Sequence, residues 1–64
     1  MATNLKTLRE RAKITQEELA EMSGVARSTI SALEAGHFVN ITAKTMKALA
    51  RALGVSASEI FSGL

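Results

Sequence analysis

Apolar residues recur at intervals of three and four along most of the chain, which is the spacing of one face of an α-helix. The pattern predicts five helices, at about residues 4–12, 15–24, 24–36, 42–53 and 56–61. No segment alternates apolar and polar residues for long, so no strand is expected. The fold class predicted is therefore all-α, a compact bundle of five short helices.

Helix-capping residues agree with this division of the chain. Thr15 and Glu18 have the spacing of a capping box, in which each side chain bonds the other residue's backbone amide at a helix start. Ser56 and Glu59 repeat the pattern before the fifth helix, and Thr42 is placed to cap the fourth. Glycines that can end a helix follow three of the predicted helices, at Gly24, Gly36 and Gly54.

The apolar faces of these helices define the expected core. Its predicted members are Leu5, Leu8, Leu19, Met22, Val25, Ile30, Leu33, Ile41, Met46, Leu49, Leu53, Val55 and Ile60. With 64 residues, the chain is expected to form one domain, residues 1–64, near the lower size limit for independent folding.

Composition excludes several classes of function. Cysteine is absent, so disulfides and thiolate metal sites are excluded, and His37 alone has no partners for a zinc site. The chain shows no nucleophile–base pair or phosphate loop, so no catalysis, metal, cofactor or small-molecule substrate is expected.

No apolar run approaches the roughly 20 residues that span a bilayer, and the first residues lack the apolar stretch of a signal peptide. A cytoplasmic protein is expected, whose net charge of +2 permits a nucleic-acid partner without requiring one.

The third predicted helix has an unusual polar face. At about 100° per residue, Thr29, Ile30 and Leu33 fall on one side, which should face the core. Exposed helix faces usually carry long residues such as Glu, Lys and Gln, which also favour helix. Here short side chains and one arginine fall on the opposite arc, which comprises Arg27, Ser28, Ser31, Ala32 and Ala35. Such an arc lets the helix backbone approach another surface closely.

The second and third helices are separated by a turn of about three residues that begins at Gly24. This turn is too short for two helices to pack side by side in antiparallel fashion, so they should cross steeply. That arrangement is a helix-turn-helix, in which the second helix enters the major groove of DNA.

The segment "TQEELAEMSGVARSTISALEAG" resembles the helix-turn-helix of the lambda repressor and Cro-like (XRE) family of bacterial and phage DNA-binding regulators. The resemblance extends through "LRERAKI" before it and "MKALARALGVSASEIF" after it, and so covers nearly the whole chain. It implies a five-helix lambda-repressor-like domain with its helix-turn-helix at about residues 16–35. Residues at family spacing are Gln16, Leu19, Ala20, Gly24, Val25, Ile30, Leu33, Glu34, Gly36 and the segment Leu53-Gly54-Val55-Ser56.

The resemblance implies roles for individual residues. Arg27 and Ser28 match positions that reach base edges, and Ser31 and Ala32 lie one turn further on the same face. Phosphate contacts are expected from Gln16, Thr29, His37, Asn40 and Lys44. Several alternatives stay open. Arg27 can instead be a phosphate contact or a free surface charge, and Thr29 a half-buried hydroxyl. Gln16 and His37 can be ordinary surface residues.

Other positions have structural implications. In the family, an arginine of the first helix forms an ion pair with a glutamate near the end of the third helix. Arg9 and Glu34 match these two positions, so the resemblance implies that they pair. Some positions depart from the family pattern. Lys13 stands where many relatives have glycine, and Ala26 replaces the usual Ser or Thr cap of the third helix. The last helix is where relatives commonly dimerise, which makes interface candidates of Val55, Ser58, Phe61 and Leu64.

Sequence-specific binding of double-stranded DNA is the function that these observations favour. We expect a small transcriptional regulator that acts as a repressor and binds a palindromic operator as a homodimer. When bound to DNA it would be associated with the nucleoid. Two alternatives use the same fold. One is a protein-interaction module or antitoxin-like subunit, and the other is a structural bundle without a partner of its own.

Overall fold

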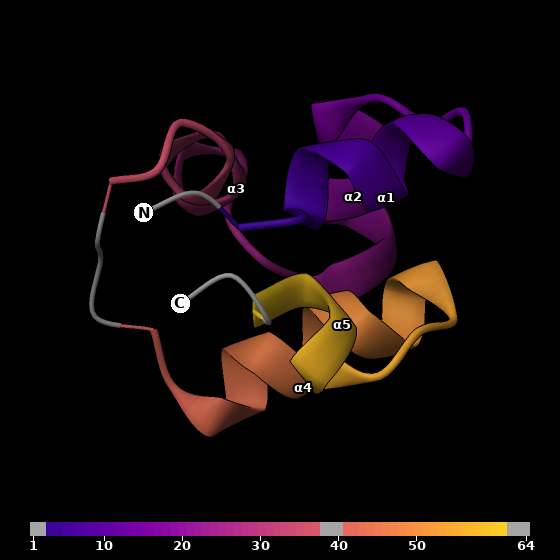
Figure 1. Cartoon of the computed structure of the whole chain (residues 1–64). Coiled ribbons are helices and arrows are strands. Elements are labelled where there is room, and N and C mark those ends of the chain that lie inside the picture. Colours follow the sequence, from indigo (N-terminus) through magenta and orange to yellow (C-terminus); the bar gives the residue numbers. More distant parts are fainter. Residues whose placement is uncertain (1–2, 38–40, 62–64) are drawn as a thin grey trace.

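The computed structural model describes residues 3–37 and 41–61, so the predicted contacts of Asn40 and Leu64 lie outside the described residues. This part of the chain contains five helices and no strand (Figure 1). The helices are α1 (Leu5–Arg11), α2 (Gln16–Ser23), α3 (Arg27–Glu34), α4 (Ala43–Leu53) and α5 (Ala57–Phe61). The all-α fold expected from the apolar spacing is confirmed. No described helix has the length and apolar character needed to cross a membrane.

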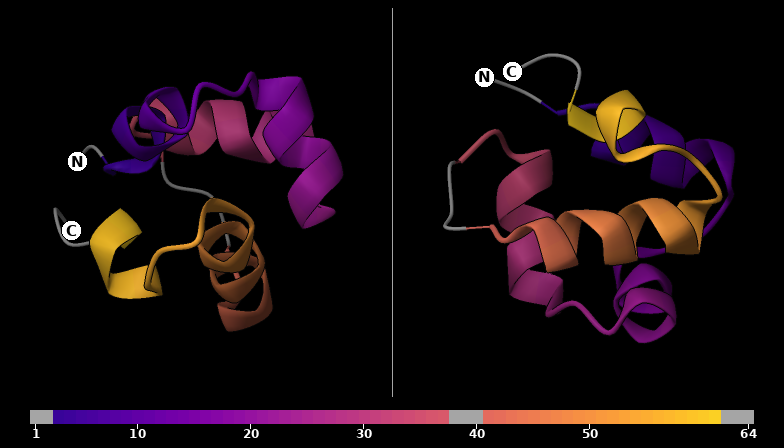
Figure 2. Two further views of the ribbon diagram at one scale, coloured as in Figure 1. Left: turned by 90° about the vertical axis from the view of Figure 1, so that its right-hand side faces the viewer. Right: turned by 90° about the horizontal axis from the view of Figure 1, so that it is seen from below.

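The helices pack around one small core. Helix α2 contacts both α3 and α4, while α5 lies against α1 and α4 (Figure 2). Residues from all five helices meet in this core, namely Leu5, Leu19, Ile30, Leu33, Leu49, Ala50 and Ile60. Because each helix is short, its burial against the others contributes more to its stability than its own helix propensity does.

Capping side chains fix where the helices begin. The Thr15 hydroxyl accepts a hydrogen bond from the Glu18 amide at 3.0 Å, and the Glu18 carboxylate accepts one from the Thr15 amide at 2.8 Å. The Thr42 hydroxyl likewise accepts from the Thr45 amide at the start of α4. Gly24 follows α2 with a φ of 73°, in the left-handed region where glycine avoids a steric cost. The predicted helix boundaries agree with the observed ones to within two residues, except that α3 begins at Arg27, three residues after the predicted start.

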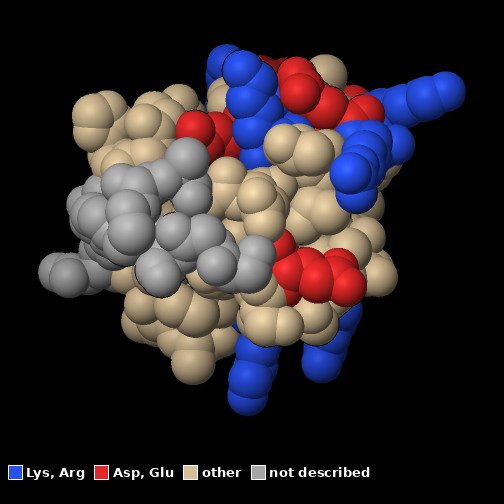
Figure 3. Space-filling model, viewed as in Figure 1, with Lys and Arg blue, Asp and Glu red and all other residues tan. Residues whose placement is uncertain are grey.

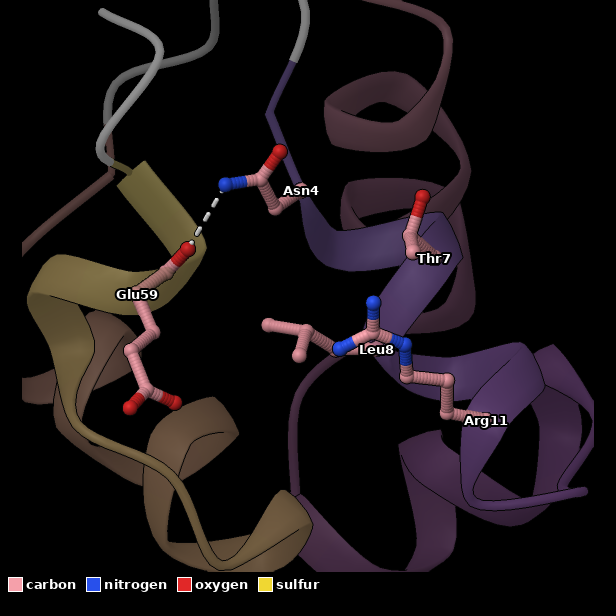
Figure 4. Close-up of a pocket in the computed structure, with 5 residues that line it drawn as sticks. All are labelled: Asn4, Thr7, Leu8, Arg11 and Glu59. Carbon is pink, nitrogen blue, oxygen red and sulfur yellow. Dashed lines mark hydrogen bonds between the residues drawn. The ribbon is translucent and has the colours of Figure 1, made fainter.

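The residues before α1 connect it to two other helices. The Thr3 hydroxyl donates to the Leu33 carbonyl oxygen at 3.1 Å, near the end of α3. The Asn4 backbone amide donates to the Ile60 carbonyl oxygen, and its side-chain amide donates to the Glu59 carbonyl oxygen at 2.9 Å (Figure 4). These bonds hold α5 beside α1, where the two helices border an open cleft.

Met22 is not part of the core, contrary to the sequence prediction. Its side chain is 56% exposed, although Leu19 on the same helix is fully buried. Viewed down the axis of α2, the arc that faces the core runs from Leu19 through Ser23 to Ala20. Ala20 packs against the core, and the Ser23 hydroxyl donates to the Leu19 carbonyl oxygen. Met22 lies on the opposite flank of Leu19, outside this arc.

Lys13 has a φ of 59°, a left-handed conformation that is unfavourable for residues with a side chain. This conformation costs roughly 1–2 kcal/mol. Glycine would avoid this cost, but its larger freedom in the unfolded chain would cancel part of the gain. We expect Lys13→Gly to raise the free energy of unfolding by about 0.5–1 kcal/mol. Urea denaturation of the two proteins measures this difference, and an unchanged or lower stability of the variant would contradict the expectation.

Helix α3 begins without a capping side chain, because its N-cap residue is Ala26. A serine there has a hydroxyl that can accept a hydrogen bond from an amide of the first turn. Ala26→Ser is therefore expected to stabilise the fold by about 1 kcal/mol. Thermal unfolding monitored by circular dichroism tests this. Ala43→Ser is the control, because it adds a hydroxyl at the first position of α4, where Thr42 already caps the helix. Equal stabilisation by both changes would rule out the capping explanation.

Candidate nucleic-acid interface

The turn between α2 and α3 holds the two helices at a steep angle, which Figure 2 shows. The Gly24 amide donates to the Ala20 carbonyl oxygen at 2.9 Å, and the Val25 amide donates to the Ser23 hydroxyl at 3.2 Å. Val25 also packs against the core, so the turn is anchored at its centre. The geometry is that of the predicted helix-turn-helix.

Helix α3 buries one face and exposes the other. Ile30 and Leu33 are in the core, whereas Ser28, Ser31 and Ala35 are exposed. The exposed face is thus made of short side chains, with Arg27 at its N-terminal end. Two residues that the sequence placed in the interface, Thr29 and Ala32, are half-buried, so less of each side chain can reach a ligand.

The Arg9 and Glu34 side chains form a bidentate ion pair that connects α1 to the end of α3. Arg9 Nε lies 2.6 Å from Glu34 Oε2, and Arg9 Nη2 donates to Glu34 Oε1 at 3.1 Å. The third nitrogen, Arg9 Nη1, donates to the Ile14 carbonyl oxygen at 2.7 Å. The two side chains are only 12% and 5% exposed, so the pair is well shielded from water.

This environment shifts the pKa of both partners. Burial acts to raise the pKa of the Glu34 carboxyl, but hydrogen bonds from Arg9 and Gln16 and the charge of Arg9 outweigh it, and the pKa is lowered. The hydrogen bond to Glu34 raises the pKa of Arg9, against the opposing effect of burial. Both groups therefore stay charged near neutral pH, and the pair fixes α3 relative to α1.

Gln16 has an intramolecular partner that the sequence did not reveal. Its side-chain amide donates to Glu34 Oε1 at 3.1 Å, which holds the side chain at the N-terminal end of α2. Within residues 3–37 and 41–61 it makes no second hydrogen bond, so one N–H remains for an external acceptor. Gln16 and Glu34 lie on different helices, 18 residues apart, so no local pattern in the sequence predicts this contact.

Arg27 lies beside Glu17, the second residue of α2, which sequence reasoning did not single out. Arg27 Nη1 donates to Glu17 Oε1 at 3.3 Å, and the two side chains are 62% and 75% exposed. Both border an open cleft between the N-terminal ends of α2 and α3, which is lined by Arg9, Thr15, Gln16, Glu17 and Arg27. The structure therefore brings Gln16 and Arg27 together on one side of the molecule.

The remaining predicted contact residues are more widely spread. His37 is exposed just after α3, and its backbone amide donates to the Ala32 carbonyl oxygen. Lys44 is exposed in the first turn of α4 and borders an open cleft with Lys47 and Arg51. These three cations form no ion pair within the described part of the chain. Basic side chains project from the side of α4 in Figure 3, whereas basic and acidic side chains mix at the upper edge.

The candidates for a dimer interface are partly used inside the chain. Val55 and Phe61 are half-buried and pack against the core of their own chain. Ser58 is exposed, and its hydroxyl lies 3.0 Å from that of Ser56. Only part of the apolar surface at this corner is therefore available to a second copy.

A small helical bundle in which the second helix of a helix-turn-helix exposes a face of short side chains has the architecture of a DNA-binding domain. A helix-turn-helix family model matches residues 5–60. An uncharacterized HTH-type transcriptional regulator from Archaeoglobus fulgidus is 39% identical over 61 residues, which cover 95% of this chain and 84% of that protein. The chain belongs to the Cro/C1-type (XRE) helix-turn-helix family of DNA-binding transcription regulators, whose members are typically not enzymes. The resemblance inferred from the sequence is thereby confirmed.

Proposed function

We propose that this protein binds double-stranded DNA sequence-specifically by placing α3 in the major groove. The observation that carries the proposal is the exposed face of α3, where Ser28 and Ser31 present short side chains behind Arg27. A guanidinium at the start of such a face can bond O6 and N7 of a guanine with two parallel N–H groups. The open cleft beside it, with Gln16 at the start of α2, is a site for a neighbouring phosphate.

Each predicted residue has a place in this proposal. Ser28 and Ser31 contact base edges next to the guanine read by Arg27, and the methyl group of Ala32 borders a thymine methyl. Phosphate contacts come from a second set of residues around this face, comprising Gln16, Thr29, His37, Asn40 and Lys44. The pair Arg9–Glu34 holds α3 in position for these contacts and does not touch DNA itself.

The finer aspects of the function are also proposed. Residues 1–64 act as one domain, and two copies form a homodimer whose α3 helices lie about 34 Å apart, in successive major grooves of a palindromic operator. Val55, Ser58, Phe61 and Leu64 are the interface candidates. The protein acts as a cytoplasmic repressor that excludes other proteins from the site it occupies.

Light scattering of the protein with and without a duplex containing two half-sites tests the dimer. A protein that stays monomeric in both samples contradicts it.

Titration of mixed-sequence duplex DNA at several salt concentrations tests the binding itself. Phosphate contacts release counterions, so the affinity of a DNA-binding protein falls steeply as salt rises. A module that docks on another protein is expected to bind these duplexes barely at all. Absence of salt-dependent binding would therefore favour the protein-interaction alternative.

A further inference from the structure

The first turn of α2 carries its own negative charge at the point where the proposed function places a phosphate. The N-terminal end of a helix attracts anions, and Gln16 is available there. Glu18 in this turn is occupied by the capping box with Thr15. Glu17 instead extends into solvent, with a side chain that is 75% exposed. Its carboxylate repels any phosphate that approaches the cleft, and so opposes binding that depends on the DNA backbone alone.

The same carboxylate bonds the residue proposed to read a base. Only Nη1 of Arg27 contacts Glu17, at 3.3 Å. Within the described part of the chain, Nε and Nη2 of Arg27 make no hydrogen bond. These two nitrogens form one edge of the planar guanidinium and present two parallel N–H groups, which match O6 and N7 of guanine. Glu17 can therefore hold Arg27 while this edge stays free for a base.

We propose that Glu17 is a specificity-determining residue, which orients Arg27 toward guanine and weakens binding to DNA that lacks it. This inference rests on the proposed function, because it assigns Glu17 a role at the same DNA-binding site. Glu17 acts through Arg27 and through its charge, and is thus a positioning residue. Its charge lowers the affinity for every duplex, and its contact with Arg27 restores affinity only where the guanine is present.

Glu17→Gln tests the inference, with Glu21→Gln as a matched control. Glu21 is an exposed carboxylate on the same helix that forms no ion pair within residues 3–37 and 41–61. Affinities are measured for a duplex selected from a random pool, for the same duplex with the Arg27-dependent guanine replaced, and for a random duplex. For Glu17→Gln we expect tighter binding to the random duplex and a guanine preference lowered about two- to fivefold, the range of an exposed ion pair. Glu21→Gln should leave the preference unchanged.

Repeating the measurement with Arg27→Ala separates the two effects of Glu17. In that background Glu17→Gln should still tighten binding to every duplex, while no guanine preference remains for it to alter. If Arg27→Ala removes the preference but Glu17→Gln leaves it intact, the inference fails and the proposed function stands. If the preference survives Arg27→Ala, or wild-type protein binds no duplex in a salt-dependent manner, the proposed function fails and the inference fails with it.

Discussion

Replacing Arg9 with alanine is expected to lower the free energy of unfolding by about 3 kcal/mol, because loss of one partner of a shielded ion pair leaves the other charge unpaired. Glu34 would keep only the hydrogen bond from Gln16, with its side chain 5% exposed. The Ile14 carbonyl oxygen would lose its bond from Arg9 as well. In a domain of this size such a loss lowers the melting temperature by more than about 10 °C, which thermal unfolding measures directly.

Arg11→Ala is the matched control, because it removes an exposed arginine from the same helix. Its effect on the free energy of unfolding is expected to stay within about 0.5 kcal/mol. Equal melting temperatures for Arg9→Ala and the wild-type protein would show that the pair does not fix α1 to α3. A double replacement of Arg9 and Glu34 should be less destabilising than the sum of the two single changes.

The pH dependence of stability gives a second test of this pair. Because the pKa of Glu34 is lower in the folded chain, the ionised carboxylate stabilises the fold, and this contribution is complete above the unfolded-state pKa of about 4.3. It is lost as the pH falls from that value through the lower, folded-state pKa. Chemical denaturation between pH 7 and pH 3 should therefore show wild-type protein losing its stability advantage over Glu34→Gln in the acid range. A constant difference between the two proteins would contradict this account.

Replacing Arg27 with alanine is expected to remove discrimination at one base position in each half-site, a loss of about 1–3 kcal/mol against the wrong base. The side chain is exposed and makes one bond to Glu17, so its removal should leave the fold intact. Competition binding with duplexes that differ at each position measures the preference. Circular dichroism confirms that the variant stays helical.

Lys44→Ala is the comparison for this change. As a proposed phosphate contact, it should weaken binding to all sequences about equally and reduce the salt dependence. If Arg27→Ala behaves in the same way, with uniform weakening and an unaltered preference, Arg27 contacts a phosphate and the base-reading assignment is wrong.

Most of the fold was predictable because its signals are local. The Thr15–Glu18 box and Gly24 mark the ends of α2 through contacts within a few residues. Three-dimensional packing decided what local signals missed. Met22 has an apolar side chain at a helical position near Leu19, and only the placement of α2 against α3 and α4 shows that it faces solvent.

The candidate site was predictable to a similar extent. The partnership of Arg9 with Glu34 was available only through the family resemblance, because 25 residues separate the two positions. The bonds of Gln16 to Glu34 and of Glu17 to Arg27 join different helices, and no spacing rule along the chain points to them. Which polar residues of α2 face the start of α3 depends on the crossing angle of the two helices.

Methylation interference on a selected duplex tests most directly whether α3 occupies the major groove. Guanine N7 lies in that groove, where the account places the guanidinium of Arg27. Methylation of N7 at one guanine in each half-site is expected to prevent binding by the wild-type protein and to have little effect on the residual binding of Arg27→Ala. If N7 methylation leaves wild-type binding unchanged at every guanine of the selected duplex, the proposed placement of α3 is wrong.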